Sequence, residues 1–160
     1  LSPTFANISH SGTSGVGDIG SSSNTFGTVY AVATSAKYAD VAENYSADVM
    51  YEPGTVVAFG GSEEITIAED GTRRVAGVVS SNPAYLMNSC CPGEYIVAVA
   101  LQGRVPVKVR GKIKKGDMLV SAGRGFARSE YNPIMGSVIG KALADFDGIE
   151  GIIEVVVGRL

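Results

Sequence analysis

The chain has 160 residues, of which 18% are charged, and its formal net charge is −3. This length suffices for one sizeable hydrophobic core, and so weak a charge does not favour nucleic acid as a partner. The charged fraction is below the roughly 25% typical of soluble domains, which predicts a surface partly hidden against copies of the same chain. No apolar run reaches about 18 residues, so membrane insertion is not expected.

Residues 1–35 are predicted to be an extended, Gly/Ser-rich stalk or the end of a fibre shaft. The stretch 9–25, SHSGTSGVGDIGSSSNT, consists mainly of glycine, serine and threonine, and it cannot bury enough apolar surface to offset its ordering entropy alone. Scattered apolar residues such as Val16 and Phe26 fit a segment that wraps against other chains. Because the chain begins with Leu1 and lacks a basic-then-apolar leader, we expect a fragment of a longer protein.

A short helix is predicted over residues 36–45. The apolar residues of this stretch recur at helical spacing and would form one stripe: Tyr38, Val41, Ala42 and Tyr45. Asp40 and Glu43 would then point to water, and Thr34 or Ser35 could cap the first turn.

The remainder of the unit 36–160 is predicted to be all-β. Its strand candidates are short, rich in valine and isoleucine, and bounded by Gly, Pro, Asn or Asp. They cover residues 54–59, 64–68, 73–79, 94–103, 104–113, 117–122, 125–130, 137–143 and 151–160.

This β region contains an internal repeat, covering about 50–105 and 112–160. EPGTVVAF (52–59) resembles KKGDMLVS (114–121), RVAGVVS (74–80) resembles IMGSVIG (134–140), and VAVALQGRV (97–105) resembles IEVVVGRL (153–160). The landmark glycines pair in one order: Gly54 with Gly116, Gly77 with Gly136, and Gly103 with Gly158. Two similar units of this kind predict a pseudo-duplicated β-barrel or sandwich, which also hides strand edges.

A basic strand is expected at 104–115, RVPVKVRGKIKK. Alternation along a strand puts its cations on one face of the sheet: Arg104, Lys108, Arg110, Lys112 and Lys114. The branched apolar residues between them would occupy the other face. Two interpretations stay open, a solvated strand face or a basic patch for an anionic glycan, a nucleotide or an acidic neighbouring subunit. The stretch lacks the interleaved aromatic residues that bind single-stranded nucleic acid.

Ser35 and Lys37 are the candidates for nucleophilic chemistry, with Asp40 and Glu43 nearby. A desolvated neutral lysine can take the proton of a serine. Residues two apart share a face on an extended strand but not on a helix, so the spacing leaves the question open.

No cofactor or metal is expected. The only histidine is His10, and the glycine-rich stretch GTSGVGDIG lacks the lysine of a phosphate-binding loop. The two cysteines, Cys90 and Cys91, are adjacent, which excludes a disulfide framework.

Several blocks together resemble the C-terminal domain of phage tail-fibre and virion structural proteins of the marine tailed-phage type. The blocks are DIGSSSNTFGTVYA (18–31), AKYADVAENY (36–45), YEPGTVV (51–57), RRVAGVVSSNPAYLMN (73–88), VALQGRVPVKV (99–109), KKGDMLVSAGRGFA (114–127) and GSVIGKAL (136–143). More distantly, ADVAENY and the β region that follows resemble the intramolecular-chaperone autoproteolytic peptidases of phage fibres and spikes.

The resemblance implies a homotrimer at the end of a fibre, located on the virion or a cell surface, with the fibre shaft as its upstream partner. It also implies a possible self-cleavage, with Ser35 and Lys37 as candidates and Asp40 and Glu43 as assistants. A third hypothesis is a receptor-binding tip that uses the basic strand or the loop 80–88 for a host glycan or protein.

Overall fold

The computed structural model describes residues 11–13, 19, 21, 23–26, 28 and 39–158. The chain divides into two units, Leu1–Ser35 and Ala36–Leu160. In the first unit, Ser21 and Asn24 exchange two backbone hydrogen bonds of 3.0 and 3.2 Å, and the stalk character of this unit stays a prediction. Within the described residues, no helix is long and apolar enough to cross a membrane.

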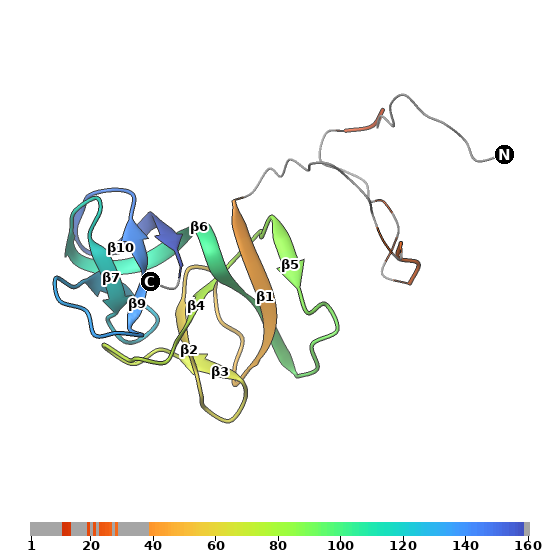
Figure 1. Cartoon of the computed structure of the whole chain (residues 1–160), viewed down its shortest axis with the longest axis horizontal. Coiled ribbons are helices and arrows are strands. Elements are labelled where there is room, and N and C mark those ends of the chain that lie inside the picture. The colour runs from red at the N-terminus through yellow and green to blue at the C-terminus, as the bar shows by residue number, and fades with distance from the viewer. Residues whose placement is uncertain are drawn as a thin grey trace. The chain divides into compact units, whose positions relative to one another are not determined.

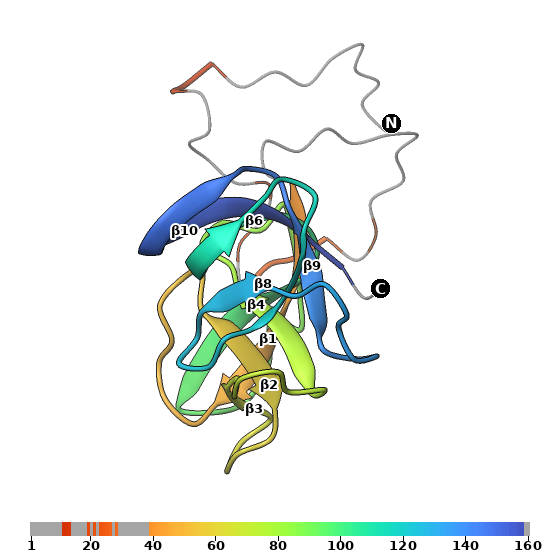
Figure 2. The same ribbon diagram turned by 90° about the vertical axis from the view of Figure 1, so that its left-hand side faces the viewer.

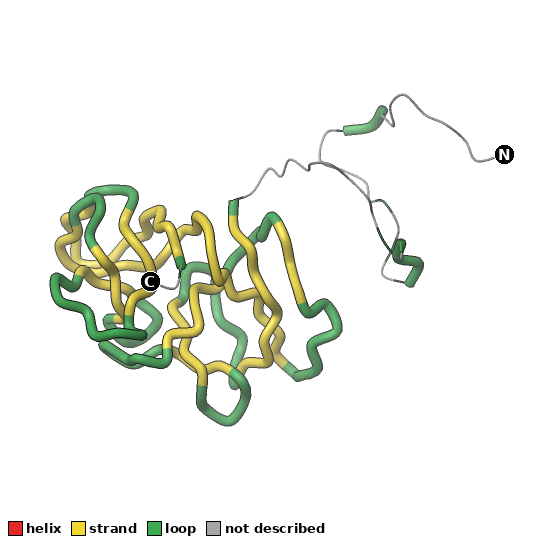
Figure 3. The backbone as a smooth tube through the Cα atoms, in the orientation of Figure 1, coloured by secondary structure: helices red, strands yellow, loops and turns green. Residues whose placement is uncertain are grey.

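The second unit is all-β, as the sequence predicts, and residues 39–158 contain no helix (Figure 3). All its strands belong to one sheet. They are β1 (Asp40–Ala47), β2 (Val56–Phe59), β3 (Ile65–Ile67), β4 (Val75–Val79), β5 (Tyr85–Met87), β6 (Tyr95–Ile113), β7 (Met118–Ser121), β8 (Ala127–Ser129), β9 (Val138–Ala142) and β10 (Phe146–Val157).

The sheet closes on itself twice and so forms two small barrels. The first ring of paired strands is β6–β4–β2–β3–β1 and back to β6, and the second is β6–β10–β9–β7–β8 and back to β6. One parallel pair closes each ring: Ala47 with Ile65 in the first, and Val109 with Ala127 in the second. The long strand β6 belongs to both barrels and runs between them (Figure 1).

Equivalent strands take equivalent places in the two barrels, which Figure 2 views from the side of the second. Strand β2 lies between β3 and β4, as β7 lies between β8 and β9. The backbone bond from Gly54 N to Val79 O has its counterpart from Gly116 N to Ala142 O, and both are 2.8 Å long. This register matches Gly54 with Gly116, as the sequence indicates. That the barrels descend from one repeated unit stays a prediction.

The register corrects a second glycine match. Gly77 pairs with Val57, and Gly140 pairs with Leu119, so the counterpart of Gly77 is Gly140 rather than Gly136. Each pairing is followed by a register shift in the partner strand. The predicted match of Gly77 with Gly136 rested on similarity of residue types alone, which does not reveal how the strands pair.

Each barrel is filled by the inward side chains of its own strands. The first interior contains Ala47, Val57, Ile65, Ala76, Val79, Val97 and Val99. Their counterparts in the second barrel are buried too: Val109, Leu119, Ala127, Ile139, Ala142, Ile153 and Val155. Ile65 corresponds to Ala127, while Ala76 corresponds to Ile139. Each barrel therefore has one isoleucine and one alanine at these two positions, on exchanged strands, and the two interiors contain a similar side-chain volume there.

The predicted helix is wrong from Asp40 onward, where the chain forms strand β1. Strand β1 pairs with β6 along its length, from Asp40 beside Gly103 to Ala47 beside Tyr95. Such a ladder provides hydrogen-bond partners for the backbone of the whole stretch. It therefore outweighs a helical pattern that rests on only four apolar residues. Residues 36–38 lie outside the described part of the chain.

Strand β6 also joins two segments that were predicted as separate strands, 94–103 and 104–113. The chain bends at Gly103, where φ is 113°, but it does not turn back. A side chain at Gly103 would collide with the carbonyl oxygen of Ala39, so glycine is what lets β1 approach this bend. The loop predicted at 80–88 contains the short strand β5.

Candidate functional site: a basic hollow, a buried carboxylate and an apolar groove

The alternation predicted for β6 is confirmed. The apolar residues of its second half are at most 1% exposed and fill the second barrel: Val105, Val107, Val109 and Ile113. The cations between them point outward. Acidic residues of β10 lie across from two of these cations, Asp147 beside Lys112 and Glu150 beside Arg110. The strand face is therefore mixed in charge rather than uniformly basic.

Three of the five predicted cations lie apart from the others. Lys108 donates from Nζ to Thr55 Oγ1 on the first barrel, at 3.0 Å. Lys114 Nζ is 3.0 Å from Asp145 Oδ2. The hydrogen bond to Asp145 and the negative charge of that carboxylate raise the pKa of Lys114. Arg104 lines a different hollow, which lies beside β1. Whether the whole face binds a ligand stays a prediction.

The other two predicted cations help to form what we call the basic hollow, on the second barrel. Its cationic lining is Arg110, Lys112, Arg124 and Arg128. Arg110 Nη2 is 2.9 Å from Glu150 Oε1, and the guanidinium carbon lies 4.6 Å from the centre of the Phe126 ring. This cation–π contact and the ion pair fix the plane of the guanidinium.

Arg128 is held from two sides. Its Nε is 3.0 Å from Asp70 Oδ1, and its Nη1 is 2.8 Å from Glu130 Oε2. The hydrogen bond with Glu130 is the largest cause that raises the pKa of Arg128 above its ordinary value. Arg128 thus lines the hollow with its Nε and Nη1 donors already engaged by Asp70 and Glu130.

Arg124 sits in an unusual turn at the rim of the hollow. Gly123, Arg124 and Gly125 all have positive φ, of 73°, 54° and 78°. Phe126 N donates to Gly123 O at 3.1 Å, which makes Arg124 and Gly125 the central residues of a tight turn. Sequence reasoning missed Arg124 and Arg128, and the Gly-Arg-Gly triplet was the signal available for the first.

Of the predicted self-cleavage residues, the structure describes only Asp40 and Glu43. Ser35 and Lys37 lie outside the described residues, so their role stays a prediction. Glu43 accepts a hydrogen bond of 2.8 Å from Tyr45 Oη and lines the apolar groove described below. Asp40 lines a different hollow, because the two residues lie on opposite faces of β1 rather than on one face of a helix.

Asp40 was expected to point to water, but it is only 3% exposed. Pairing with β6 buries it, and among the described residues its Oδ2 has no hydrogen-bond partner. The hollow beside it is lined by polar side chains that include Ser80, Ser81, Arg104 and Glu154. A buried carboxylate oxygen without a donor is costly, and such a group commonly has a role beyond folding.

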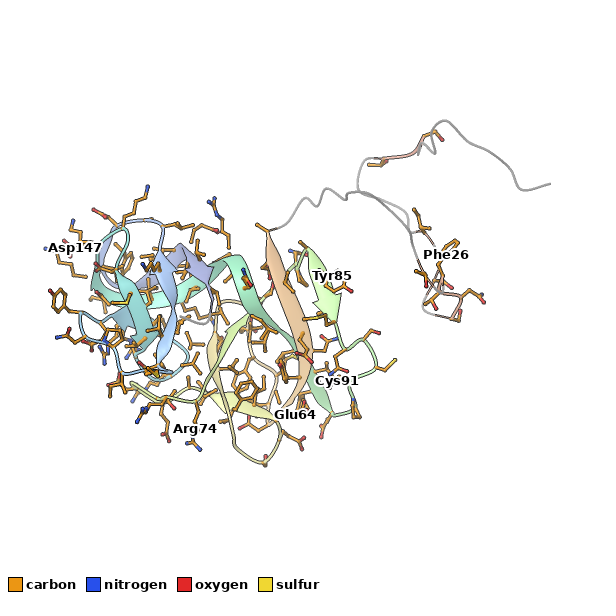
Figure 4. All side chains as sticks on the ribbon, in the orientation of Figure 1. Phe26, Glu64, Arg74, Tyr85, Cys91 and Asp147 are labelled. Carbon is orange, nitrogen blue, oxygen red and sulfur yellow. The ribbon has the colours of Figure 1, made fainter. Side chains whose placement is uncertain are left out.

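What we call the apolar groove runs between the start of β1 and the end of β10. Val41, Leu101 and Val156 line it, and Val41 and Val156 are 39% and 43% exposed. Beside it, the edge strand β5 exposes Tyr85 and Leu86, and Tyr85 projects from that edge in Figure 4. In the described part of the chain β5 pairs only with β1, so its outer edge is open.

The cysteines do not form a reactive or metal-binding cluster. Cys90 is exposed, and Cys91 is half-buried with its Sγ 3.9 Å from Glu64 Oε2 (Figure 4). Burial and the charge of Glu64 raise the pKa of Cys91, which disfavours the thiolate. Across the described residues, no group of three or more ligand side chains could hold a metal ion.

No protein-family model matches this chain, and no curated protein matches it. Solved structures of bacteriophage phi29 share its fold. The C-terminal fragment of gene product 12 aligns with a TM-score of 0.58 at 16% identity, over 74% of this chain and 99% of the fragment. The pre-mature gene product 12 aligns with a TM-score of 0.63 at 15% identity, over 82% of this chain and 23% of that protein.

The N base of the phi29 head fibre gp8.5 aligns with a TM-score of 0.46 at 19% identity, over 72% of this chain and 92% of that one. At 16% and 15% identity, the two gene product 12 structures show a likeness of fold alone. The resemblance to autoproteolytic peptidases stays a prediction.

Proposed function

We propose that this chain is the C-terminal domain of a phage-type fibre or related virion appendage, and that it holds three copies together. The observation that carries the proposal is the match between its fold and nearly the whole C-terminal fragment of a phage protein whose pre-mature form is much longer. Residues 1–35 would be the end of the shaft, and the protein would reside on the virion.

The exposed apolar residues support self-assembly. Val41, Val156, Tyr85 and Leu86 are between 39% and 64% exposed, and they lie along the apolar groove and the open edge beside it. Exposed apolar residues gathered in one region are typical of an interface. Three copies packed through it would bury this area and hold the shaft strands in register.

Size-exclusion chromatography with light scattering tests the proposal. We expect the 160-residue chain to be a trimer at micromolar concentration. The double variant Val41→Asp, Val156→Asp would put two carboxylates into the groove and should give a monomer with an unchanged far-UV circular dichroism spectrum. Met135→Asp is the matched control, because Met135 is 84% exposed outside the groove, and it should stay trimeric. The proposal would be overturned if the parent chain is a monomer, or if the double variant Val41→Asp, Val156→Asp stays trimeric as the control does.

A second function, self-cleavage, is favoured by the unpartnered Oδ2 of Asp40. In this reaction Ser35 Oγ attacks a peptide carbonyl of the chain, neutral Lys37 takes the serine proton and passes it to the leaving amine, and water then hydrolyses the ester. Asp40 would orient or polarise these groups, with Glu43 as a second assistant.

Expression of a chain with its upstream segment tests this second function. The parent should give two bands on a denaturing gel, Ser35→Ala should give one, and the control Ser23→Ala should behave as the parent does. A single uncut band from the parent would eliminate self-cleavage.

A further inference from the structure

We propose that the basic hollow of the second barrel binds a phosphate or sulfate group carried by a saccharide. This goes beyond the assembly role and does not depend on it, because the hollow is lined by other residues than the apolar groove.

Comparison of the barrels shows that the fold does not require these cations. The turn that holds Arg124 is closed by a bond of 2.8 Å from Ala122 N to Phe126 O, and its counterpart in the first barrel by one of 3.1 Å from Gly60 N to Glu64 O. By this register the first barrel carries uncharged or acidic residues where the hollow has Arg110, Lys112, Arg124 and Arg128, namely Asp48, Met50, Ser62 and Thr66. At these four equivalent positions, positive charge is therefore found in the second barrel alone.

Donors of the hollow remain available to a ligand. The side chains of Arg124 and Lys112 make no hydrogen bond or ion pair to any described residue, so their donors are open to a ligand. Arg110 Nε also has no partner among the described residues, but it is buried and is not counted among these donors. Arg110 keeps its orientation through Glu150 and Phe126. Planar guanidinium groups held in place bind tetrahedral oxyanions through two donors at once.

Arg124 occupies a backbone conformation that glycine or asparagine adopts with less strain. Among the described residues, only Asn88 and Arg124 have positive φ without being glycine. Side chains with a Cβ are disfavoured there, and such outliers concentrate at binding sites. A glycine on each side of Arg124 makes the turn possible, so the sequence accommodates an arginine at this point of the rim.

The floor of the hollow favours a saccharide over the alternatives. Gly111 and Gly148 line part of it, with the 90% exposed Ile149 beside them, and the absence of side chains at the two glycines leaves room for a sugar ring. Arg110 already covers one face of the Phe126 ring, so that face is closed to a stacking base. Strands β6 and β10 already pair with each other there, so no free edge is offered to a peptide backbone.

Isothermal titration calorimetry at low ionic strength tests the proposal. The probes are a sulfated oligosaccharide, a phosphorylated one, their uncharged parent, inorganic sulfate and phosphate, and two polyanions of other classes, an oligoglutamate and an oligodeoxynucleotide. We expect at least one charged oligosaccharide to bind saturably, more tightly than its inorganic ion, and more weakly as salt is added. Whichever of the two charged oligosaccharides binds shows whether the hollow takes a sulfate or a phosphate group.

The test variants replace residues of the hollow by their counterparts in the first barrel, and one further variant is the control. Arg124→Ser and Lys112→Met introduce the counterpart residues and should weaken binding about tenfold and about threefold, at an unchanged urea midpoint. Arg104→Gln removes the same charge outside the hollow and should leave binding intact. The proposal is overturned if neither charged oligosaccharide binds, if Arg124→Ser has no effect, or if Arg104→Gln weakens binding equally. It is also overturned if an oligoglutamate, an oligodeoxynucleotide or the inorganic ion binds as tightly.

Discussion

Gly77 and Gly140 are counterparts in the two barrels because both lie where one strand crosses a neighbour at close range. A Cβ on Gly77 would collide with the carbonyl oxygen of Ala100, and one on Gly140 with that of Val156. We predict that Gly77→Ala and Gly140→Ala each lower the free energy of unfolding by about 2 kcal/mol or more. Urea denaturation measures this. Gly158→Ala is the control, since a Cβ there has open space, and an equal loss in all three would contradict the explanation.

Asp48 gives the first barrel a pH-dependent contribution to stability. Burial alone would raise the pKa of Asp48, but hydrogen bonds from Thr66 and Tyr51 outweigh it and hold the pKa below its ordinary value. Thr66 Oγ1 is 2.6 Å from Asp48 Oδ2. Because the folded pKa is lowered, this contribution is complete above the unfolded pKa of about 3.8 and is lost as pH falls through the folded value.

The corresponding variant is Asp48→Asn. We predict that it lowers the free energy of unfolding by about 1–2 kcal/mol at pH 7 and by less at pH 3, where the parent has begun to lose the same charge. Urea midpoints at the two pH values measure the difference. A gap that stays constant between them would show that charge is not the cause.

At the scale of elements, β5 is a three-residue strand that pairs only with β1 among the described strands, and two asparagines hold its end in place. Asn88 Nδ2 donates to Asn44 O at 2.9 Å, and Asn44 Nδ2 donates to Asn88 O at 3.2 Å. We predict that Asn88→Gly, which suits the positive φ there but removes one donor, speeds amide exchange of Tyr85–Met87 about tenfold with little change in global stability. Asn132→Gly in the second barrel should leave this exchange unchanged.

The elements also show where sequence reasoning succeeds. The alternation of Val105, Val107 and Val109 with polar residues predicted the buried face of β6, because a period of two directly records which side of a strand is covered. The apolar pattern of residues 36–45 led to the wrong prediction of a short helix, since four apolar positions fit both a short helix and a strand. Only the pairing with β6 decides between them.

For the whole molecule, the shared strand predicts that the barrels unfold together. The larger buried cluster joins Val56 and Val78 of the first barrel to the interior of the second, so neither barrel can open without exposing the other. We expect one calorimetric transition, and Ile65→Ala and Leu119→Ala, one in each barrel, should lower the same midpoint with losses of about 2–5 kcal/mol. Two resolved transitions, each sensitive to one variant only, would contradict this.

The sequence alone determined the fold class and most strands, because burial of valine and isoleucine against short turns is a local property that composition and periodicity report. It also indicated two similar halves through Gly54 and Gly116. Tertiary structure decided that β6 serves both barrels, that Asp40 is buried, and that Arg124 and Arg128 join Arg110 and Lys112. These features depend on which distant strands pair and in which register, and no local pattern carries that information.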